Sequence, residues 1–345
     1  MSNSHPFLRA GFFVLAAFLA FPCHAAKTDI VTLINGNTIT GEIKTLDFGA
    51  LRYSTDSMGT VSIDWEDIVN IASNRNLQIE LTDGSRYFGS LLMANDDFHI
   101  RIRTASKEVE LPSQQIVRIT PIEQGDRFWQ NLEGSFSLGF QAQKSSEVAT
   151  SNVNIDVYRR ARKFLVGLQV TSAVTDQPTE QTKARQSAQI NYQRFRGDRW
   201  FTDWFTSLEK NDELGIRGRT SAGGAVGRYI MQTNRNQLSL TGGLQAARTS
   251  YTGADESATE AEGRIEIRYL HRSLIPDASI MFTTKIFPLL KDLNRIRAES
   301  DLSFRREFLD DFYLDLTIGH SYLSQPPDDA SSTDYNVTTS LGYSF

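Results

Sequence analysis

Cysteine is almost missing from this chain, and the single cysteine, Cys23, falls within the first 25 residues. These residues are typical of a secretory signal peptide, since an apolar run over residues 11–21 is followed by a small-x-small site that ends at Ala25. A lipoprotein site at Cys23 is disfavoured because Ala20 stands where such sites normally carry leucine. Cleavage after Ala25 would remove the thiol, which excludes disulfides, thiolate metal sites and a cysteine nucleophile from the rest of the chain.

Long apolar runs are missing as well. Beyond residue 26, no stretch approaches the roughly 18 consecutive apolar residues that a membrane-spanning helix needs. Nine prolines and the lack of a convincing amphipathic helix favour an all-β fold. A transmembrane β-barrel would escape the hydropathy test, because its lipid-facing and lumen-facing residues alternate and give a mildly polar average.

The chain has no excess of positive charge, with 36 Lys and Arg against 41 Asp and Glu. Loss of Arg9 with the signal peptide would leave 35 against 41, a net charge near −6. A chain of this charge is not expected to bind nucleic acid. Scattered histidines without cysteine form no recognisable transition-metal site, so we expect no metal and no other cofactor.

The last eleven residues alternate strictly between two kinds of side chain. Tyr335, Val337, Leu341, Tyr343 and Phe345 fall on one face, and small or polar residues fall on the other. This pattern is typical of a barrel strand with one lipid-facing side and one polar, lumen-facing side. A closing aromatic in this register resembles the end of a bacterial outer-membrane barrel. We therefore predict that the assembly signal read by the barrel-assembly machinery is Leu341, Tyr343 and Phe345.

Residues 126–345 break into about twelve alternating segments, each long enough to cross a bilayer at a tilt. Short links such as residues 159–163 and 195–199 alternate with long ones such as residues 175–184 and 324–334. This rhythm predicts short periplasmic turns, long extracellular loops and both termini in the periplasm. The predicted fold class is all-β: a transmembrane antiparallel β-barrel of about twelve strands, preceded by two small β repeats.

Charge divides between the two kinds of link. The long loops carry acids, and the short turns carry arginines. The two readings are plain solvated charge, or acidic loops that share divalent cations with outer-membrane lipid and surface lipopolysaccharide. The acids are Asp176, Glu180, Asp212, Glu213, Asp255, Glu256, Asp328 and Asp329, and the arginines are Arg159, Arg160, Arg162, Arg196, Arg199, Arg305 and Arg306.

Residues 27–122 contain a tandem repeat with copies at 27–74 and 75–122. Seven residue pairs lie 48 positions apart, and in the middle of each copy a 47-residue spacing, which matches Leu51 with Phe98 and Tyr53 with Ile100, fits better. Asn35-Gly36 and Asp83-Gly84 predict tight hairpins, so each copy is expected to be a small, strongly bent sheet. The pairs are Leu33 and Leu81, Gly36 and Gly84, Gly41 and Gly89, Val61 and Val109, Ile63 and Leu111, Ile68 and Ile116, and Ile71 and Ile119.

The repeat pattern V-x-L-x-[ND]-G followed by a second glycine resembles Sm-like and SH3-like barrels. Sm-like folds often bind RNA, but the many acids of these copies and a periplasmic address argue against it. Three roles stay open: a rigid spacer, a plug for the barrel, or a module that docks on a periplasmic protein or peptidoglycan.

Four runs carry a family resemblance: NYQRFRGDRWF at residues 191–201, EKNDELGIRGR at 209–219, GGAVGRY at 223–229 and DYNVTTSLGYSF at 334–345. Through them, residues 129–345 resemble the YdiY-like family of salt-induced outer-membrane proteins, a domain of unknown function numbered 481. The resemblance implies an outer-membrane barrel without an established activity. The N-terminal repeats are additional to that family core, so function need not reside in the barrel alone.

Two charged clusters are candidate sites. The first is a ladder of alternating sign on the expected lumen face, which suits either a polar pore or a closed, salt-bridged filling. The second lies at a loop-to-strand junction and suits either a binding rim for a charged solute or a loop anchored by local ion pairs. The ladder is Glu262, Arg264, Glu266, Arg268, Arg297, Glu299 and Asp301; the rim cluster is Asp212, Glu213, Arg217 and Arg219.

An enzyme is a remote alternative, and no enzyme is expected. His271 and Ser273 copy the His-x-Ser spacing of an outer-membrane phospholipase, and residues two apart on a strand share a face. However, the predicted topology puts His271 at a periplasmic turn, the wrong end for that enzyme. Aromatic girdles at the two membrane interfaces are expected from Trp129, Trp200, Trp204, Tyr192, Tyr313 and Phe345.

The sequence thus predicts an outer-membrane barrel with a structural or narrow-channel role and a periplasmic docking or plug module. The alternative is an envelope protein that binds a periplasmic partner or peptidoglycan.

Overall fold

A computed structural model describes residues 27–122, 132–143, 148–161, 163–176, 182–197, 199–253, 257–273, 278–309, 312–326 and 331–344. Several predicted features lie outside these ranges: the signal peptide, Trp129, Arg162, Glu180, Asp255, Glu256, Asp328, Asp329 and Phe345. Within them, no helix is long and apolar enough to cross a membrane.

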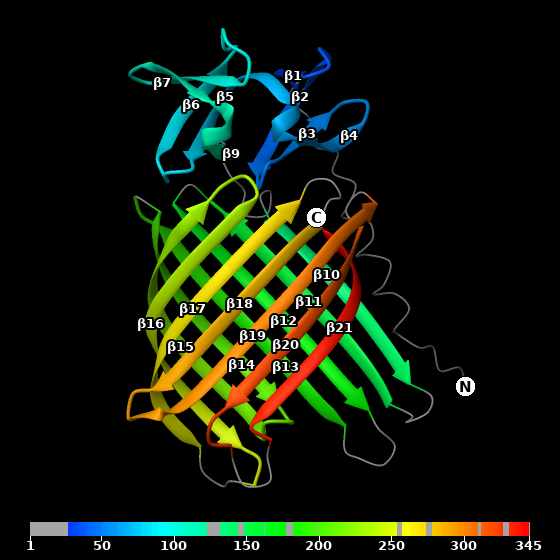
Figure 1. Cartoon of the computed structure of the whole chain (residues 1–345), viewed down its shortest axis with the longest axis vertical. Helices are drawn as coiled ribbons and strands as arrows, with labels where there is room; N and C mark the ends of the chain where they lie inside the picture. Colours follow the sequence, from blue (N-terminus) through cyan, green and yellow to red (C-terminus); the bar gives the residue numbers. More distant parts are fainter. Residues whose placement is uncertain are drawn as a thin grey trace, which may run out of the picture.

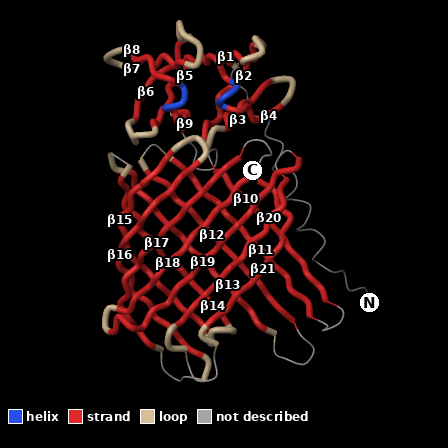
Figure 2. Tube along the Cα trace, in the orientation of Figure 1, coloured by secondary structure: helices blue, strands red, loops and turns tan. Residues whose placement is uncertain are grey.

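Twelve antiparallel strands form a closed barrel, as the sequence predicted (Figures 1 and 2). Its seam joins the first strand to the last, with Phe136 opposite Tyr343 and Leu138 opposite Leu341. The strands are β10 (Leu132–Gln143), β11 (Val148–Arg160), β12 (Phe164–Asp176), β13 (Lys183–Phe195), β14 (Trp200–Asn211), β15 (Ile216–Gln232), β16 (Asn236–Tyr251), β17 (Ala258–Ser273), β18 (Ala278–Leu289), β19 (Asp292–Leu309), β20 (Phe312–Leu323) and β21 (Thr333–Ser344).

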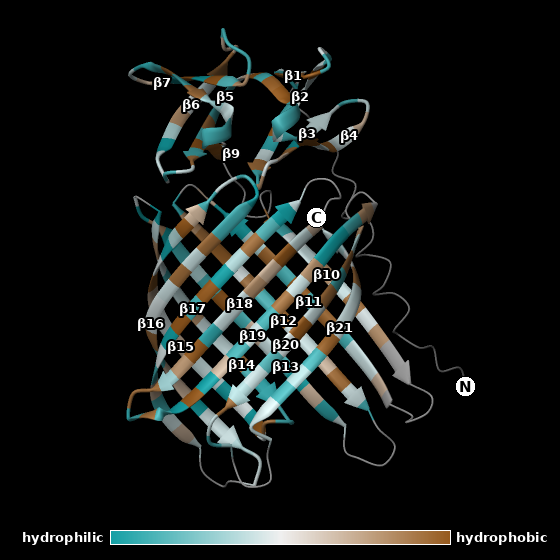
Figure 3. Ribbon diagram, in the orientation of Figure 1, coloured by the Kyte–Doolittle hydropathy of each residue, from teal (hydrophilic) through white to brown (hydrophobic). Residues whose placement is uncertain are grey.

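The barrel wall alternates in polarity because successive side chains of a strand point to opposite faces. On β21, Tyr335, Val337 and Leu341 are 78%, 54% and 53% exposed, whereas Ser340, on the opposite face, is buried. The alternation repeats around the wall as stripes of apolar and polar residues (Figure 3). An apolar exterior around a polar lumen is the architecture of an outer-membrane β-barrel.

The predicted position of Tyr313 in an aromatic girdle is wrong. Trp200, Trp204 and Tyr192 are exposed on the outer face, but Tyr313 is buried and points into the barrel. The cause is its register on β20, where it shares the inner face with Asp315. A Cβ added at Gly342 of β21 would lie 2.2 Å from the Tyr313 ring, so the glycine makes room for the aromatic side chain.

The N-terminal residues fold into a nine-stranded sheet wrapped around one hydrophobic core, which we call the repeat module. Its strand pairing repeats with the sequence: Val31 pairs with Ile71, and Ile79 pairs with Ile119, with a bulge one residue later in both copies. The strands are β1 (Asp29–Leu33), β2 (Thr38–Asp47), β3 (Ala50–Thr55), β4 (Gly59–Asp64), β5 (Ile68–Leu81), β6 (Arg86–Leu92), β7 (His99–Thr104), β8 (Glu108–Pro112) and β9 (Ile116–Pro121).

The two copies are not separate sheets, because β5 runs unbroken across the border at residues 74 and 75. Its first half closes the first copy by pairing with β1, and its second half opens the second copy by pairing with β6. The end of β2 also pairs with β9, at Asp47 and Arg118. The copies therefore share strands as well as a core.

The predicted spacing in the middle of the copies is wrong. Leu51 pairs with Ile63, and Ile100 pairs with Leu111, so Leu51 corresponds to Ile100, 49 positions on, rather than to Phe98. Leu51 and Ile100 are both fully buried, whereas Phe98 is 39% exposed. The second copy is thus longer by one residue before β7, which apolar matching alone did not reveal.

The repeat module sits over one end of the barrel (Figure 1). At this end lie the short links between β11 and β12, β13 and β14, and β15 and β16, and β21 also ends here. The strands β13 and β21 start at the opposite end. The module is therefore placed at the mouth that the sequence predicted to be periplasmic.

Candidate functional site: a charge-crossed lumen beneath a docked module

The lumen is lined by charged side chains from β14 to β19. On β17, Glu262 and Arg264 are buried on the inner face, while Ile265 and Ile267 are exposed on the outer face. Glu266 pairs across the strands with Lys285 of β18, and Arg264 donates a 2.6 Å hydrogen bond to Glu266. The ladder residues predicted on β17 and β19 all lie on this inner face: Glu262, Arg264, Glu266, Arg268, Arg297, Glu299 and Asp301.

The predicted rim cluster is divided by the fold. Asp212 forms an ion pair with Lys210 at 3.1 Å, and Glu213 forms one with Lys183 at 3.2 Å. Arg217 is exposed, whereas Arg219 is buried in the lumen. The physical reason is a register shift between residues 216 and 218 of β15, which sets the two arginines apart. The four residues therefore do not form one binding rim.

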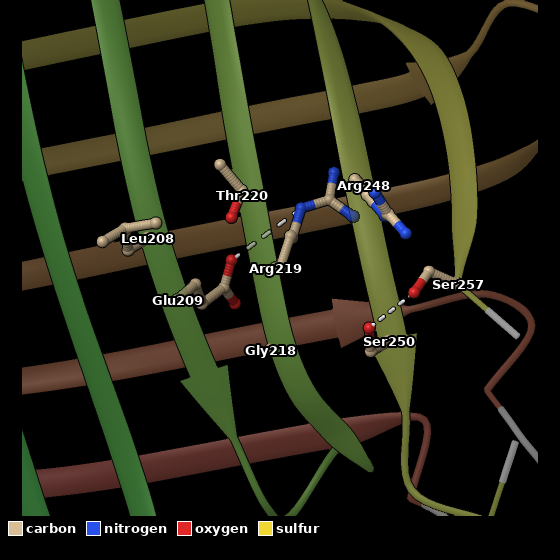
Figure 4. Close-up of a pocket in the computed structure, with 8 residues that line it drawn as sticks. All are labelled: Leu208, Glu209, Gly218, Arg219, Thr220, Arg248, Ser250 and Ser257. Atoms are coloured by element: carbon tan, nitrogen blue, oxygen red, sulfur yellow. Dashed lines mark hydrogen bonds and ion pairs between the residues drawn. The ribbon is translucent and has the colours of Figure 1, made fainter. Parts of the chain in front are cut away.

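Arg219 instead joins the charge ladder. Its guanidinium binds Glu262 of β17 and donates to Thr249 Oγ1 of β16 at 2.7 Å. It also lies 4.0 Å from Glu209 of β14 (Figure 4). Gln245 donates a second, 2.7 Å hydrogen bond to Glu262. Four neighbouring strands are thus tied together from the inside.

The first of two crossings of the lumen is an ion pair between β14 and β19. Arg297 Nη1 of β19 lies 3.3 Å from Glu209 Oε2 of β14, and these strands face one another across the barrel. Arg297 also pairs with Glu299 on its own strand and lies over the Phe287 ring at 4.1 Å. Because Glu209 is shared by Arg219 and Arg297, we call Glu209, Arg219, Glu262, Arg297 and Glu299 the lumen bridge.

A second crossing lies at the same end. Arg185 of β13 donates a 2.6 Å hydrogen bond to Asn336 of β21 and lies 3.6 Å from Asp334. Asn211 of β14 donates to Asp334 at 3.2 Å. Arg185 and Asp334 stand at the starts of their strands and Asn211 at the end of its own, next to the long loops. Both crossings therefore narrow the lumen toward the mouth that faces away from the repeat module.

Sequence reasoning missed Glu209 as a lumen residue, and it missed Arg185 and Asp334. Each shares strand parity with a residue that was recognisably inward, since Asp334 lies on the Ser340 face of β21. Parity could have placed them on the inner face, but it could not have shown which opposite strand they meet.

The repeat module meets the barrel through one buried carboxylate. Glu80, near the end of β5, lies 3.5 Å from Arg160 Nη2 of β11 and accepts a 3.2 Å hydrogen bond from Gln232 Nε2 of β15. Within the module, Arg118 and Arg86 lie 3.6 Å and 3.5 Å from the same carboxylate, at ion-pair distance. We call Glu80, Arg86, Arg118, Arg160 and Gln232 the docking hub.

The electrostatics of the hub favour an ionised Glu80. Burial alone would raise the pKa of its carboxyl, but Arg118, Arg160 and Arg86, with the Gln232 hydrogen bond, outweigh burial and lower the pKa to about 2. Arg118 is also held by Asp47 at 2.6 Å, and these carboxylates raise the pKa of Arg118 against the effect of its burial. The hub is therefore a charged cluster at neutral pH, with more cations than anions.

Weaker contacts surround the hub. Glu66 of the module forms a 2.7 Å ion pair with Arg235 in the link between β15 and β16, and both side chains are largely exposed. Arg86 and Arg160 lie over the ring of Phe195, at 5.2 Å and 4.2 Å from its centroid. Arg160, one of the arginines of the predicted basic turns, is thus a partner of the module rather than plain solvated charge.

Comparison with known proteins gives one family match. The sequence model described as "Protein of unknown function, DUF481" matches residues 135–345. The chain belongs to the DUF481 family. No curated protein matches it.

Three solved structures similar to this DUF481 chain are distant in sequence. A NanC porin is 10% identical with a TM-score of 0.39, and the two chains are covered over 62% of this chain and 98% of the porin. The β domain of the Bordetella autotransporter BrkA is 13% identical with a TM-score of 0.32, over 62% and 97%. A porin refined at 1.8 Å is 8% identical with a TM-score of 0.28, over 92% and 98%.

The histidine and serine of the hydrolase hypothesis lie on the outer face of the DUF481 barrel, near the module end. His271 Nδ1 is 2.9 Å from Asn236 Oδ1, which also accepts a 2.8 Å hydrogen bond from Tyr269 Oη. Ser273 follows two residues later on the same face. The hydrogen bond described for the imidazole is therefore to an amide and not to the serine that a nucleophilic mechanism would need.

Among the described residues, no group of three or more His, Cys, Asp or Glu side chains is arranged to hold a metal ion. The chemistry that the DUF481 barrel offers is electrostatic: paired charges across a polar lumen and a charged latch at one mouth.

Proposed function

We propose that this outer-membrane barrel is a narrow channel that its own residues hold shut, with the repeat module in the periplasm. The observation that carries the proposal is the Glu209–Arg297 ion pair, which joins opposite walls at 3.3 Å. A barrel that needed only internal filling could satisfy its charges between neighbouring strands. Charge pairs across the lumen instead give a closure that can open when the pair separates.

The orientation follows from the connections. Outer-membrane barrels have short periplasmic turns and longer extracellular loops. The repeat module lies at the short-turn end, which supports a periplasmic module with the lumen bridge and the Arg185–Asp334 crossing toward the cell surface. The two closures then stand at opposite mouths, one made of side chains and the other of a folded module.

The repeat module acts as a plug that the docking hub latches in place. The hub buries one carboxylate among three guanidinium groups, and removal of one partner from such a cluster leaves uncompensated buried charge. Release of the module therefore has to be a concerted event, which suits a gate more than a loosely tethered spacer.

Single-channel recording of the full chain in planar bilayers tests the channel. The paired variant Glu209→Gln with Arg297→Gln removes the charge from both sides of the crossing, and we expect a larger conductance or a higher open probability. The control is Glu213→Gln, because Glu213 is paired with Lys183 outside the lumen bridge. Silence of the wild type and of the paired variant, with the barrel correctly inserted, would favour a purely structural barrel.

Docking of the module on a periplasmic partner is the second candidate. Ile34 and Met58, in two turns of the first copy, are 65% and 59% exposed. The turn that carries Ile34 lies on the side of the module away from the barrel (Figure 1). Co-sedimentation of the full chain with purified peptidoglycan would test one such partner, and binding that Ile34→Asp with Met58→Asp leaves unchanged would remove this surface from consideration.

A further inference from the structure

A basic groove lies where the repeat module meets the outer wall of the barrel. It has a volume of about 380 Å³. Its lining is Arg86 and Phe88 of β6, Lys163 just before β12, Arg194 and Phe195 at the end of β13, and Arg196 and Gly197 just after it. We call this the junction groove. It is separate from the lumen bridge and shares only Arg86 with the docking hub.

The groove carries positive charge that its own lining does not neutralise. Four of its side chains are cationic, and no carboxylate is among the residues that line it. Arg86 is fixed by Glu80 at 3.5 Å and by the Phe195 ring. Lys163, Arg194 and Arg196 are exposed. Among the described residues, none of these three side chains has an acidic partner within ion-pair distance.

The groove also lies at the level of the membrane surface. Arg194 is on the outer face of β13, opposite Phe164 of β12. The rings of Phe164 and Tyr192 stack at 5.7 Å on this outer face, next to exposed Trp204. Outward aromatic residues near strand ends mark the headgroup region of a bilayer. A phosphate in the adjoining leaflet would therefore meet Arg194 and Lys163 from the lipid side.

We infer that the junction groove binds the phosphate of an anionic glycerophospholipid in the periplasmic leaflet, with Arg86 of the repeat module as the third cation. Guanidinium and ammonium groups are the standard protein partners of phosphate, and clusters of them beside a membrane attract anionic lipid. Phe88, which is 37% exposed, gives the groove an apolar side that a headgroup with its glycerol can contact and that free phosphate does not need. The inference rests on the orientation proposed above.

A bound lipid here would touch both parts of the chain at once. Since Arg86 also belongs to the docking hub, headgroup binding would favour the docked position of the module. The lipid composition of the periplasmic leaflet would thus shift the equilibrium between the docked and the released position of the repeat module.

The test uses the full chain and lipids of known charge. Native mass spectrometry from vesicles of phosphatidylcholine with and without phosphatidylglycerol should show phosphatidylglycerol retained by the wild type. We expect Lys163→Gln with Arg194→Gln to lower its retention by about ten- to thirty-fold. The matched control is Arg217→Gln with Arg248→Gln, two exposed arginines near the other mouth. A shift in gel mobility between unheated and heated samples confirms that each variant is folded.

Equal retention by the wild type and the groove variant would overturn the inference. Displacement of the lipid by millimolar inorganic phosphate would assign the groove to free phosphate and overturn the lipid source. The opposite orientation of the barrel gives a different result, because protease added to intact cells would then cut the repeat module. Cleavage of the module would contradict the proposed function. Equal phosphatidylglycerol retention by the wild type and the groove variant, with the module protected from protease, would contradict only the groove.

Discussion

Glu80 and Gln232, which are 152 residues apart in the sequence, share a hydrogen bond of 3.2 Å between the repeat module and the barrel. Around this bond, three arginines from both parts of the chain approach the same carboxylate. The contact makes the junction a specific docking interface, and its partners can be replaced one at a time.

Replacement of Glu80 should release the module. Glu80→Ala leaves Arg118 and Arg160 buried without this anion, which costs on the order of 3–5 kcal/mol for a buried pair. We expect faster proteolysis in the segment between module and barrel, while the barrel keeps its gel mobility. Glu66→Ala is the matched control, since its ion pair with Arg235 is exposed and should contribute about 0–1 kcal/mol.

Docking should depend on pH only in acid. The pKa of Glu80 is lowered to about 2 in the folded protein, below the value of about 4.3 for a free Glu side chain. Stability from this group is therefore fully present above about pH 4.3 and is lost as the pH falls toward 2. Limited proteolysis across this range should show release of the wild-type module, whereas Glu80→Gln should lack this acid-dependent step. A release midpoint at pH 6 would point to another group.

The orientation of β17 can be tested by one charge on the lipid face. Ile265 is 46% exposed at the middle of the strand, so Ile265→Arg should cost about 2–4 kcal/mol in lipid. Tyr335→Arg, on the outer face at the start of β21 near the long loops, should cost only about 0–1 kcal/mol. Urea unfolding of the protein refolded into vesicles measures both. Equal costs would contradict the assigned depths.

Assembly should depend on the last strand. Leu341 is exposed on the outer face and pairs with Leu138 at the seam and with Leu314 of β20. We expect Leu341→Asp to lower the amount of folded protein in the outer membrane by more than Thr333→Asp, at the other end of β21. Comparison with spontaneous refolding in vesicles separates a lost assembly signal from a weakened seam, because only the signal requires the cellular machinery.

The hydrolase hypothesis predicts loss of phospholipid cleavage in Ser273→Ala and His271→Ala. We expect the purified wild-type protein to cleave no phospholipid above the level of these variants. Reproducible cleavage that depends on both residues would overturn the expectation that this chain is not an enzyme.

Local alternation was enough to predict the barrel, because a period of two residues defines both faces of every strand. It predicted the outer face of β21 at Tyr335, Val337 and Leu341, and it predicted which face of β17 is polar. It failed at Tyr313, where an aromatic in an interfacial position turned out to face inward. Residue type suggested a girdle there, but strand register decides the face.

Contacts between distant strands could not be read from the sequence. The Glu209–Arg297 pair exists only because the barrel closes, and nothing near residue 209 indicates which wall it will meet. The rim cluster failed for a related reason, since a local register shift separated Arg217 from Arg219. The docking hub combines residues from a repeat, a short turn and a strand end, and only the folded chain brings them together.

The shared strand β5 determines how the repeat module unfolds under force or heat. One continuous strand contributes to both copies, and one core joins them, so neither copy can loosen while the other stays intact. The module should therefore unfold in one cooperative step under force or heat. A duplicated segment has in this way become indivisible: loss of either copy would strip the other of its closing strand, and the duplication cannot be reversed by simple deletion.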